Sequence, residues 1–259
     1  MRTKRFRYIG NDSGYDLSIS DLMAALCCIF VLVTISIITS LQEKNSLADK
    51  YRELQLELFL DLQKEMGNDL EKWGAKIDPE TLTIRFSTED GFEGNEAILK
   101  DGYKNVLQEF FPKLIRVLEK DKYKNEIEEI RIEGFTAPAN GYDENGKLLF
   151  VEGSEEDYTT GIELSQLRTT NVLLYCLEQT NYSQETDPEK MEKEKDWIRK
   201  HIVSNGYSFS RPLGVDGKLI EEERKLTDAE KAASRRVEFR IKTNSDKIVQ
   251  QFQNNMEKN

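Results

Sequence analysis

Residues Leu22 to Leu41 form an uncharged, mostly apolar run, and Asp21 lies immediately before it. A helix of about 20 apolar residues spans the ~30 Å hydrocarbon core of a bilayer. A cleaved signal peptide is the alternative, but its apolar region has ~7–15 residues and ends in a small-x-small cleavage site. This run is longer and continues into Gln42 and Glu43 without such a site. The sequence therefore predicts a retained membrane helix over residues 17–41.

Charges on the two sides of this run predict its orientation. Residues 1–11 include basic side chains and no acidic one, and the first acidic residue is Asp12. The residues after the run include both acidic and basic side chains. Because the basic side of a membrane helix stays in the cytoplasm, we expect residues 1–16 inside and everything after residue 42 outside. In a bacterium the outside is the periplasm, and the protein would be a single-pass protein of the inner membrane. The basic residues before the run are Arg2, Lys4, Arg5 and Arg7.

Composition limits what the exterior part can do. The chain has 259 residues, 33% of them charged, and a net charge of −11, which is typical of a soluble domain behind the membrane helix. An acidic exterior without a basic stripe argues against nucleic acid as a partner. One histidine, His201, and the cysteines Cys27, Cys28 and Cys176 build neither a zinc site nor a disulfide framework. No nucleophile–base pair or phosphate loop stands out, so an enzyme is the least supported class.

A helical segment follows the membrane run. From Gln42 to about Trp73 there is no proline, and Leu47, Tyr51, Leu54 and Leu58 recur at heptad-like spacing. Such a short stripe predicts an amphipathic stalk that packs on another surface, its own copy included, and is too short to establish a coiled coil. Gly74 and Pro79 end the pattern. We therefore expect a periplasmic helical linker over residues 42–78.

The remaining chain alternates strand and helix patterns. Strands are expected at 82–86, 127–135, 207–211 and 236–242, and helices at 96–120, 164–179 and 197–203. A polar stretch covers 137–163, and the charge-rich segment 181–195 is expected to be a solvated helix or a loop. This order predicts an α/β (α+β) domain, a two-layer α/β sandwich over residues 79–243, followed by a tail at 244–259.

Three short motifs in this domain carry a family resemblance. Gly134-Phe-Thr136 ends a strand, Leu164-Ser-Gln-Leu-Arg168 opens a predicted helix, and Ser234-Arg-Arg-Val-Glu238 opens the last strand. Their order resembles the OmpA-like peptidoglycan-binding domain, which has a G-x-T-D strand end, an LSxxRA helix start and an NRRVE-type final strand. The resemblance covers roughly residues 80–243.

The membrane run extends this resemblance to the MotB family. The segment from Ser20 to Leu32, SDLMAALCCIFVL, is similar position by position to the MotB run that holds a proton-carrying aspartate. The segment SISDLMAAL and the short linker most resemble those of the MotB-like subunits of Zorya anti-phage systems. The resemblance implies a homodimer, a polytopic MotA-like partner forming a pentameric ring, and peptidoglycan as the wall ligand. It implies no cofactor apart from the transported ion, a proton, with sodium as the alternative.

Asp21 receives the proton-binding role from this resemblance. A carboxylate at the edge of the hydrocarbon must face protein or water, and burial there favours its neutral form, which lets it bind and release protons. A proton crossing the membrane potential releases ~2.3 kcal/mol per 100 mV. The alternative is that Asp21 caps the start of the helix, where Asp is a favoured residue.

Arg168 and Leu164 receive the peptidoglycan-binding role. In the family the arginine holds a carboxylate of the peptide stem, a task that suits its planar fork, and the leucine sets the helix start against the core. Two positions depart from the pattern: Ala137 replaces the aspartate and Gly161 an asparagine, so Asp157 is a candidate substitute acid. The alternative for Arg168 is an exposed residue in the first turn of a helix. Arg235 and Arg236 are expected to be structural, neutralising acidic neighbours.

These observations favour a non-enzymatic subunit of a proton-driven membrane motor in anti-phage defence, anchored to the cell wall. Two alternatives remain from the same residues. One is a flagellar stator subunit, which would share the chemistry of Asp21. The other is a passive OmpA-like envelope tether in which Asp21 has no proton role.

Overall fold

The computed structural model describes residues 13–87, 91–142, 145–178, 187–222 and 224–244, with residues 13–20, 41 and 43–48 described by their backbone alone. The predicted basic N-terminus before residue 13 and the predicted tail after residue 244 lie outside the described residues. Contacts divide the chain into two compact units, Met1–Tyr51 and Arg52–Asn259.

Helix α1, Ser13–Leu70, contains the predicted membrane helix and continues without a break past Gln42. Within the described residues it is the one helix long and apolar enough to cross a membrane, over Asp21–Ser40, by length and composition. Thr34 and Thr39 donate their hydroxyls to the backbone oxygens of Phe30 and Ile35, one turn earlier. These bonds satisfy the polar groups inside the helix itself, as an apolar surrounding requires.

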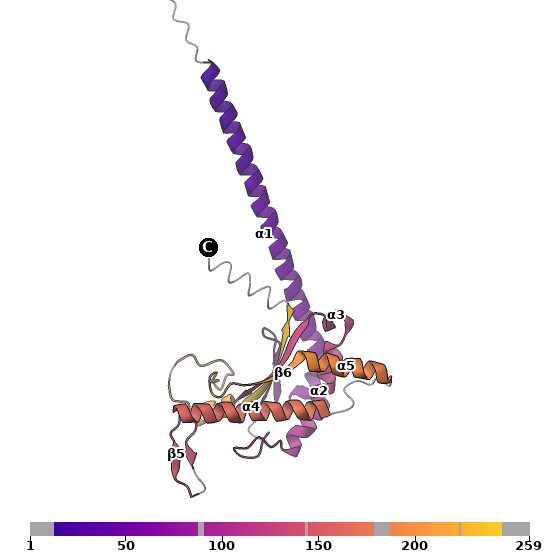
Figure 1. Ribbon diagram of the computed structural model, residues 1–259, viewed down its shortest axis with the longest axis vertical. Coiled ribbons are helices and arrows are strands. Elements are labelled where there is room, and N and C mark those ends of the chain that lie inside the picture. The colour runs from indigo at the N-terminus through magenta and orange to yellow at the C-terminus, as the bar shows by residue number, and fades with distance from the viewer. Residues whose placement is uncertain (1–12, 88–90, 143–144, 179–186, 223, 245–259) are drawn as a thin grey trace, which may run out of the picture. The chain divides into compact units, whose positions relative to one another are not determined.

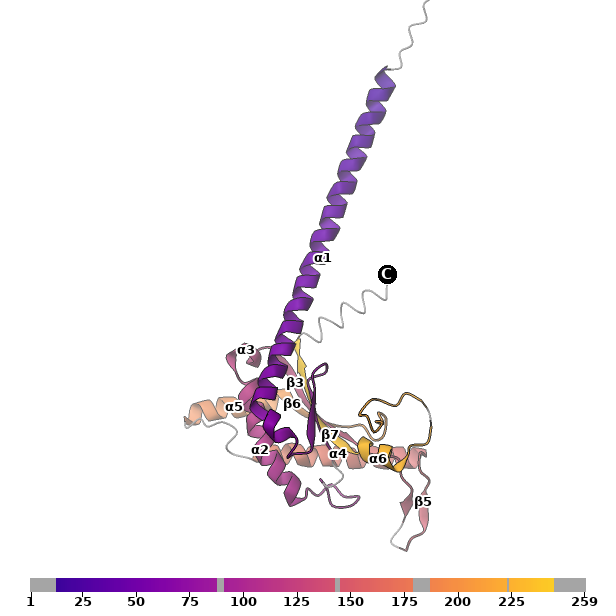
Figure 2. The same ribbon diagram turned by 180° about the vertical axis from the view of Figure 1, so that it is seen from behind.

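A five-stranded sheet is the framework of the second unit (Figures 1 and 2). Its order is β1-β2-β7-β3-β6, antiparallel except for the parallel pair of β3 and β6. A separate hairpin is formed by β4 and β5. The strands are β1 Ala75–Asp78, β2 Thr83–Ser87, β3 Ile127–Phe135, β4 Gly141–Tyr142, β5 Leu148–Phe150, β6 Ile202–Gly206 and β7 Arg236–Thr243.

Helices pack on one face of this sheet, which gives the predicted two-layer α/β architecture. Alternate strand residues such as Ile132 and Phe239 are buried in one core with α2, α4 and α5. Cys176 of α4 belongs to this core, and burial raises the pKa of its thiol, so its prediction as a small buried apolar residue is confirmed. The helices are α2 Asp101–Leu118, α3 Asp121–Lys124, α4 Glu155–Glu178, α5 Pro188–His201 and α6 Asp228–Ser234.

The second half of α1 is part of the folded domain, which differs from the predicted linker. Leu58, Leu62, Met66 and Leu70 recur on one face of the helix and are buried in the same core as the sheet. Strand β1 also lies within the predicted linker, so the compact unit begins at Arg52, well before the expected boundary at residue 79. The apolar stripe was expected to pack on another surface, a second copy included. From Leu58 onward it packs against the sheet and helices of its own domain.

Four acidic residues at intervals of four on α1 face a basic row on α2 and α3. Lys120 pairs with Asp61 at 2.9 Å, and Arg116 pairs with Glu65 at 2.6 Å. The hydrogen bond from Lys120 is the largest of several that lower the pKa of Asp61 to about 2. This acidic–basic row fixes α1 to the domain by charge as well as by apolar burial. Its remaining pairs are Asp69 with Lys113 and Glu57 with Lys122.

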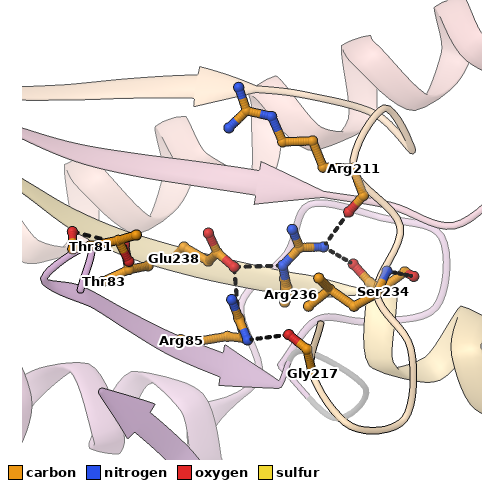
Figure 3. A network of polar contacts seen from close by, with 9 residues as sticks. Thr81, Thr83, Arg85, Arg211, Gly217, Ser234, Arg236 and Glu238 are labelled. Atoms are coloured by element: carbon orange, nitrogen blue, oxygen red, sulfur yellow. Dashed lines mark hydrogen bonds and ion pairs between the residues drawn. The ribbon is translucent and has the colours of Figure 1, made fainter. Parts of the chain in front are cut away.

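The opposite face of the sheet carries a buried ionic network (Figure 3). Arg236 donates to Glu238 at 2.6 Å and to the backbone oxygens of Arg211 and Ser234, and its guanidinium lies 3.7 Å from the centre of the Phe135 ring. Arg85, from β2, donates to the same oxygen of Glu238. The prediction that Arg236 neutralises an acidic neighbour is therefore confirmed.

Several predicted elements shift in the structure. Helix α4 begins at Glu155, nine positions before the predicted start at Leu164, because the Ser154 hydroxyl accepts the Asp157 amide and acidic side chains fill the first turn. Helix α5 ends at His201, where β6 begins, so the expected strand at 207–211 lies one segment earlier. Hairpin β4–β5 lies in the polar stretch 137–163, and helix α6 lies in a segment for which no element was predicted.

Two neighbouring acids, half-buried Glu119 at the end of α2 and buried Glu194 of α5, make the stability of the domain depend on pH. Burial, followed by the charge of buried Glu194, raises the pKa of Glu119 to about 7 from 4.5, although Lys124 pairs with it at 3.2 Å. The folded state therefore holds a proton that the unfolded state has released between these two pH values. The contribution of Glu119 to stability is therefore fully present below pH ~4.5 and is lost as the pH rises through ~7.

We expect Glu119→Gln to raise the free energy of unfolding at pH 8 by about 1–3 kcal/mol and to leave it unchanged near pH 4. Urea unfolding of the full chain in detergent at several pH values measures both. Exposed Glu71→Gln is the matched control and should follow the wild type. An identical pH dependence in the wild type and the Glu119 variant would contradict the assignment.

Candidate functional site

A pocket of about 550 Å³ brings together the two residues predicted to bind the cell wall. Arg168 and Leu164 both line it from α4, and Arg235 lines it from the segment between α6 and β7. Further walls come from the loop before α2, from the end of β3 and from the β4–β5 hairpin. A volume of this size is typical of sites that enclose a small ligand.

Arg168 lies in the middle of α4 and is 8% exposed, so the alternative of an exposed residue in a first helical turn is wrong. Its Nε donates to the backbone oxygen of Glu96 at 3.0 Å and its Nη2 to that of Gly94 at 2.9 Å. Its guanidinium stacks 4.8 Å from the centre of the Phe92 ring. Arg168 therefore fixes the loop before α2, and a guanidinium has five N–H groups, so three remain for a ligand.

Arg235 lies on the pocket wall, which differs from its predicted structural role. Among the described residues no carboxylate comes within ion-pairing distance of either Arg235 or Arg168. Burial lowers the pKa of the Arg168 guanidinium, and the positive charge of Arg235 lowers it further. Two neighbouring arginines without an acidic partner repel each other, and an anion placed between them would remove this repulsion.

The two departures from the family motif have different structural settings. Ala137 is buried on the pocket wall, where it offers no charge. Gly161 lies under the loop after β6, because a Cβ there would come 2.2 Å from the Ser208 hydroxyl oxygen. Gly161 therefore permits α4 to approach this loop.

Asp157, the candidate substitute acid, does line the pocket. Its Oδ2 accepts the backbone N–H groups of Ala139 at 3.1 Å and Gly153 at 2.8 Å. These bonds hold the two ends of the hairpin segment together, so Asp157 has a structural task beside any contact with a ligand. Glu163, an exposed residue of α4, is a second acid on the pocket wall that the sequence did not single out.

Leu164 is predicted to set the start of a helix against the core. In the structure it lines the pocket instead and is not part of the buried core. The reason is the earlier start of α4, which places Leu164 about two and a half turns inside the helix. Leu164 and Arg168 thus lie about one turn apart on one helix, as expected. Leu164, however, lines the pocket and does not belong to the core.

Asp21 belongs to the first unit and is the sole charged residue of the candidate span Asp21–Ser40. Helix α1 begins at Ser13, two turns earlier, so Asp21 lies inside the helix and is not its N-cap residue. Its side chain is exposed in the isolated chain, as are all the apolar side chains of the span. The described residues hold no cluster of His, Cys, Asp and Glu side chains able to bind a metal ion.

Comparison with known proteins decides the family. No protein-family model matches the chain. The Zorya protein ZorB from Escherichia coli strain Crooks is 30% identical over 249 residues, which cover 93% of this chain and 94% of that protein. The chain belongs to the ZorB family. The resemblance to Zorya-type subunits is therefore confirmed over nearly the whole chain, both units included.

Solved structures with a similar arrangement include a MotB-like protein from Desulfovibrio vulgaris, with 22% identity and a TM-score of 0.49. That match covers 76% of this chain and 99% of the other. The cell wall anchor of the T6SS from Pseudomonas aeruginosa has 12% identity and a TM-score of 0.42, over 71% of this chain and 97% of the other.

Proposed function

We propose that this ZorB-family chain is the MotB-like stator subunit of a proton-driven rotary motor that acts in anti-phage defence. The observation that carries the proposal is the family membership across nearly the whole chain, together with a single carboxylate at the edge of the one candidate span among the described residues. Two copies would place their α1 helices inside a ring of polytopic MotA-like partners. Proton passage through Asp21 would turn the ring against this fixed axle.

Membrane orientation follows from the basic N-terminus. With residues 1–16 in the cytoplasm, the α/β domain lies in the periplasm of a single-pass inner-membrane protein. The membership in the ZorB family favours the defence role over a flagellar stator. A passive tether would share the fold and the wall contact, and it would differ only in the role of Asp21.

The exterior domain would hold the stator by gripping peptidoglycan with the arginine pocket. Arg168 and Arg235 can donate to one carboxylate of a peptide stem from two directions, and a carboxylate is the planar acceptor that matches a guanidinium fork. Because Arg168 also holds the loop at Gly94 and Glu96, its removal would disturb the fold. Arg235, which is half-buried, is therefore the better residue to test.

We expect Arg235→Ala to lower the amount of protein that sediments with purified sacculi by about tenfold, the loss for one charge-assisted hydrogen-bonded contact of ~1.5 kcal/mol. Sedimentation of the full-length protein in detergent measures this. Arg240→Ala, a half-buried arginine of strand β7 outside the pocket, is the control and should sediment like the wild type. Equal sedimentation of the two variants would place the wall contact elsewhere.

A further inference from the structure

The face of the sheet turned away from the helices carries an excess of basic side chains. Residues opposite each other on neighbouring strands point to the same face, and so do alternate residues of one strand. The register of β1, β2, β7 and β3 places four acidic residues there, Asp78, Glu129, Glu133 and Glu238. It places six basic residues there, which we call the basic sheet face: Lys76, Arg85, Arg131, Arg236, Arg240 and Lys242. A chain of net charge −11 thus has a face of the opposite sign.

Two of the acids are neutralised by arginines of the same face. Glu238 accepts from Arg85 at 2.7 Å and from Arg236 at 2.6 Å, as Figure 3 shows. Glu129 accepts from Arg131 at 2.7 Å. Because three arginines share two carboxylates, these ion pairs leave a surplus of positive charge on the face.

The other two acids have no lysine or arginine within ion-pairing distance among the described residues. Asp78 accepts two backbone N–H groups of the turn that follows it. Glu133 is 1% exposed, and burial raises the pKa of its carboxyl, although the charge of Arg240 opposes this shift. A buried carboxyl that favours its neutral form balances less of the positive charge in front of it. Neither acid therefore pairs with the basic side chains at the surface of this face.

Three basic side chains of this face have no acidic partner within the part of the chain that the structure describes. Lys76 is exposed, and Arg240 and Lys242 are half-buried. Arg240 lies directly opposite Arg131 on the neighbouring strand, and like charges at such a position destabilise a sheet. The basic sheet face thus holds fixed positive charges that repel each other, and anions in front of them would remove this repulsion.

The regular spacing of these charges favours a planar array of anions. Neighbouring strands lie about 4.8 Å apart, and alternate residues of one strand lie about 7 Å apart. The phosphate groups of a bilayer surface form a planar array and move laterally, so they can meet charges that a sheet holds fixed. A nucleic-acid strand is bound instead in a charged groove and on exposed aromatic rings. Phe135, the aromatic residue that these strands place on this face, is 3% exposed beneath the guanidinium of Arg236.

The chain itself also brings a bilayer close to the domain. The unit that contains the sheet begins at Arg52, and the candidate span ends at Ser40. A surface joined to the domain by so short a segment is met far more often than the same surface free in solution. Each lysine or arginine near an anionic membrane surface contributes ~1 kcal/mol, so a few unpaired cations are enough for a contact under these conditions.

We propose that the basic sheet face binds the phosphate headgroups of anionic phospholipids. Lys76, Arg240 and Lys242 contact the phosphates, and Arg131 adds to the positive charge behind them. The contact is electrostatic and uses none of the residues that line the arginine pocket. It gives the domain a lipid ligand besides the cell wall, so the two contacts can be removed by separate substitutions.

Binding of the full-length protein to separate vesicles tests the inference. The protein is held in nanodiscs of zwitterionic phosphatidylcholine, so that its apolar helix is already occupied by lipid. These nanodiscs are mixed with large vesicles of phosphatidylcholine alone or of equal parts phosphatidylcholine and phosphatidylglycerol, and flotation measures the bound protein. We expect binding to the phosphatidylglycerol vesicles alone, and its loss at about 1 M salt, where the Debye length is ~3 Å.

Neutral substitutions on the face should weaken this binding step by step. We expect Arg240→Gln and Lys242→Gln each to lower the vesicle partition coefficient by about fivefold, as ~1 kcal/mol for each basic residue implies. The triple variant that also carries Lys76→Gln should lower it by about a hundredfold. Lys193→Gln is the matched control, because Lys193 is an exposed lysine of α5, which packs on the other face of the sheet. It should stay within about twofold of the wild type.

Four results would overturn the inference. The first is equal flotation with both kinds of vesicle, and the second is equal loss of binding in Lys193→Gln and Lys242→Gln. The third is full binding by the triple variant, which would assign the vesicle contact to the basic N-terminus. The fourth is tight binding of a labelled single-stranded oligonucleotide that displaces the vesicles and is lost in the triple variant, which would make nucleic acid the ligand.

A second assay separates the lipid contact from the wall contact. The triple variant should still sediment with sacculi like the wild type, because purified sacculi contain no phospholipid and the arginine pocket is unchanged. Loss of both flotation and sedimentation in a folded triple variant would show that the face serves the wall, and would also overturn the inference. Thermal unfolding of each variant, compared with the wild type, shows whether a loss of binding is a loss of fold.

Discussion

Asp21→Asn is expected to abolish protection against phage without lowering the amount of protein in the membrane. Asparagine keeps the size and the hydrogen-bonding capacity of aspartate, but it cannot take up a proton. No other residue of the span Asp21–Ser40 carries a charge, so no neighbour can replace the lost carboxylate. Plating efficiency of phage on cells that carry the variant, with membrane levels measured by immunoblotting, tests the expectation.

Asp21→Glu is the graded companion of this variant. It keeps the acid but moves it outward by one methylene, about 1.5 Å, so we expect partial protection at most. Asp49→Asn is the control, because Asp49 is an exposed residue of α1 beyond the candidate span and should tolerate the change. Full protection by Asp21→Asn would contradict the proton role and favour a passive tether. Normal copurification of Asp21→Asn with the ring partner would confirm that only proton transfer was removed.

The apolar helix and the core strands were predictable because each has a simple local pattern in the sequence. An uncharged helical run has few alternatives at this length, and the strands at 82–86, 127–135 and 236–242 match β2, β3 and β7 within two residues. The parts that we missed depend on contacts between distant segments. The role of α1 in the core is one of them, because an amphipathic helix looks the same whether it packs on its own domain or on a partner.

One available signal would have placed α1 on the domain. Acidic residues recur at every fourth position of this helix, at Glu57, Asp61, Glu65 and Asp69. Such a row on one face of a helix predicts basic residues on the surface that packs against it. The basic residues of α2 and α3 supply that row. The start of α4 was harder to see, because the LSxxR motif drew the boundary to Leu164 and hid the acidic first turn at Glu155.

Arg235 and Arg236 are neighbours whose different surroundings could not be predicted from the sequence. Both residues open the last strand and both were predicted to neutralise acids, yet a strand turns successive side chains to opposite sides. The structure sends Arg236 into the ionic network with Glu238 and leaves Arg235 on the pocket wall. The adjacent arginines therefore lie in different settings, Arg236 in the buried network and Arg235 on the pocket wall, and this difference leads to the largest stability effect that we expect.

Arg236→Ala should lower the free energy of unfolding by about 3 kcal/mol, whereas Arg235→Ala should change it by about 0.5 kcal/mol or less. Arg236 is buried and is bound to Glu238 and to two backbone oxygens, all of which would lose a donor. Burial opposes the ionisation of Glu238, but Arg236 and Arg85 outweigh it and lower the pKa of that carboxyl. Without Arg236, Arg85 alone would hold a buried negative charge.

Chemical unfolding of the full chain in detergent, followed by circular dichroism, compares the two alanine variants. Arg236→Lys adds a graded case: the charge remains, but a single ammonium group cannot reproduce the fork that bonds Glu238 and the two backbone oxygens together. Its stability should therefore fall between those of the wild type and Arg236→Ala. If the two alanine variants proved equally stable, the buried network would not be what fixes β7 to the loop at Arg211. The alternative outcome is that Arg236→Ala unfolds at a lower denaturant concentration, while Arg235→Ala keeps its stability but no longer sediments with sacculi. In that case Arg236 serves the fold and Arg235 serves binding to the cell wall.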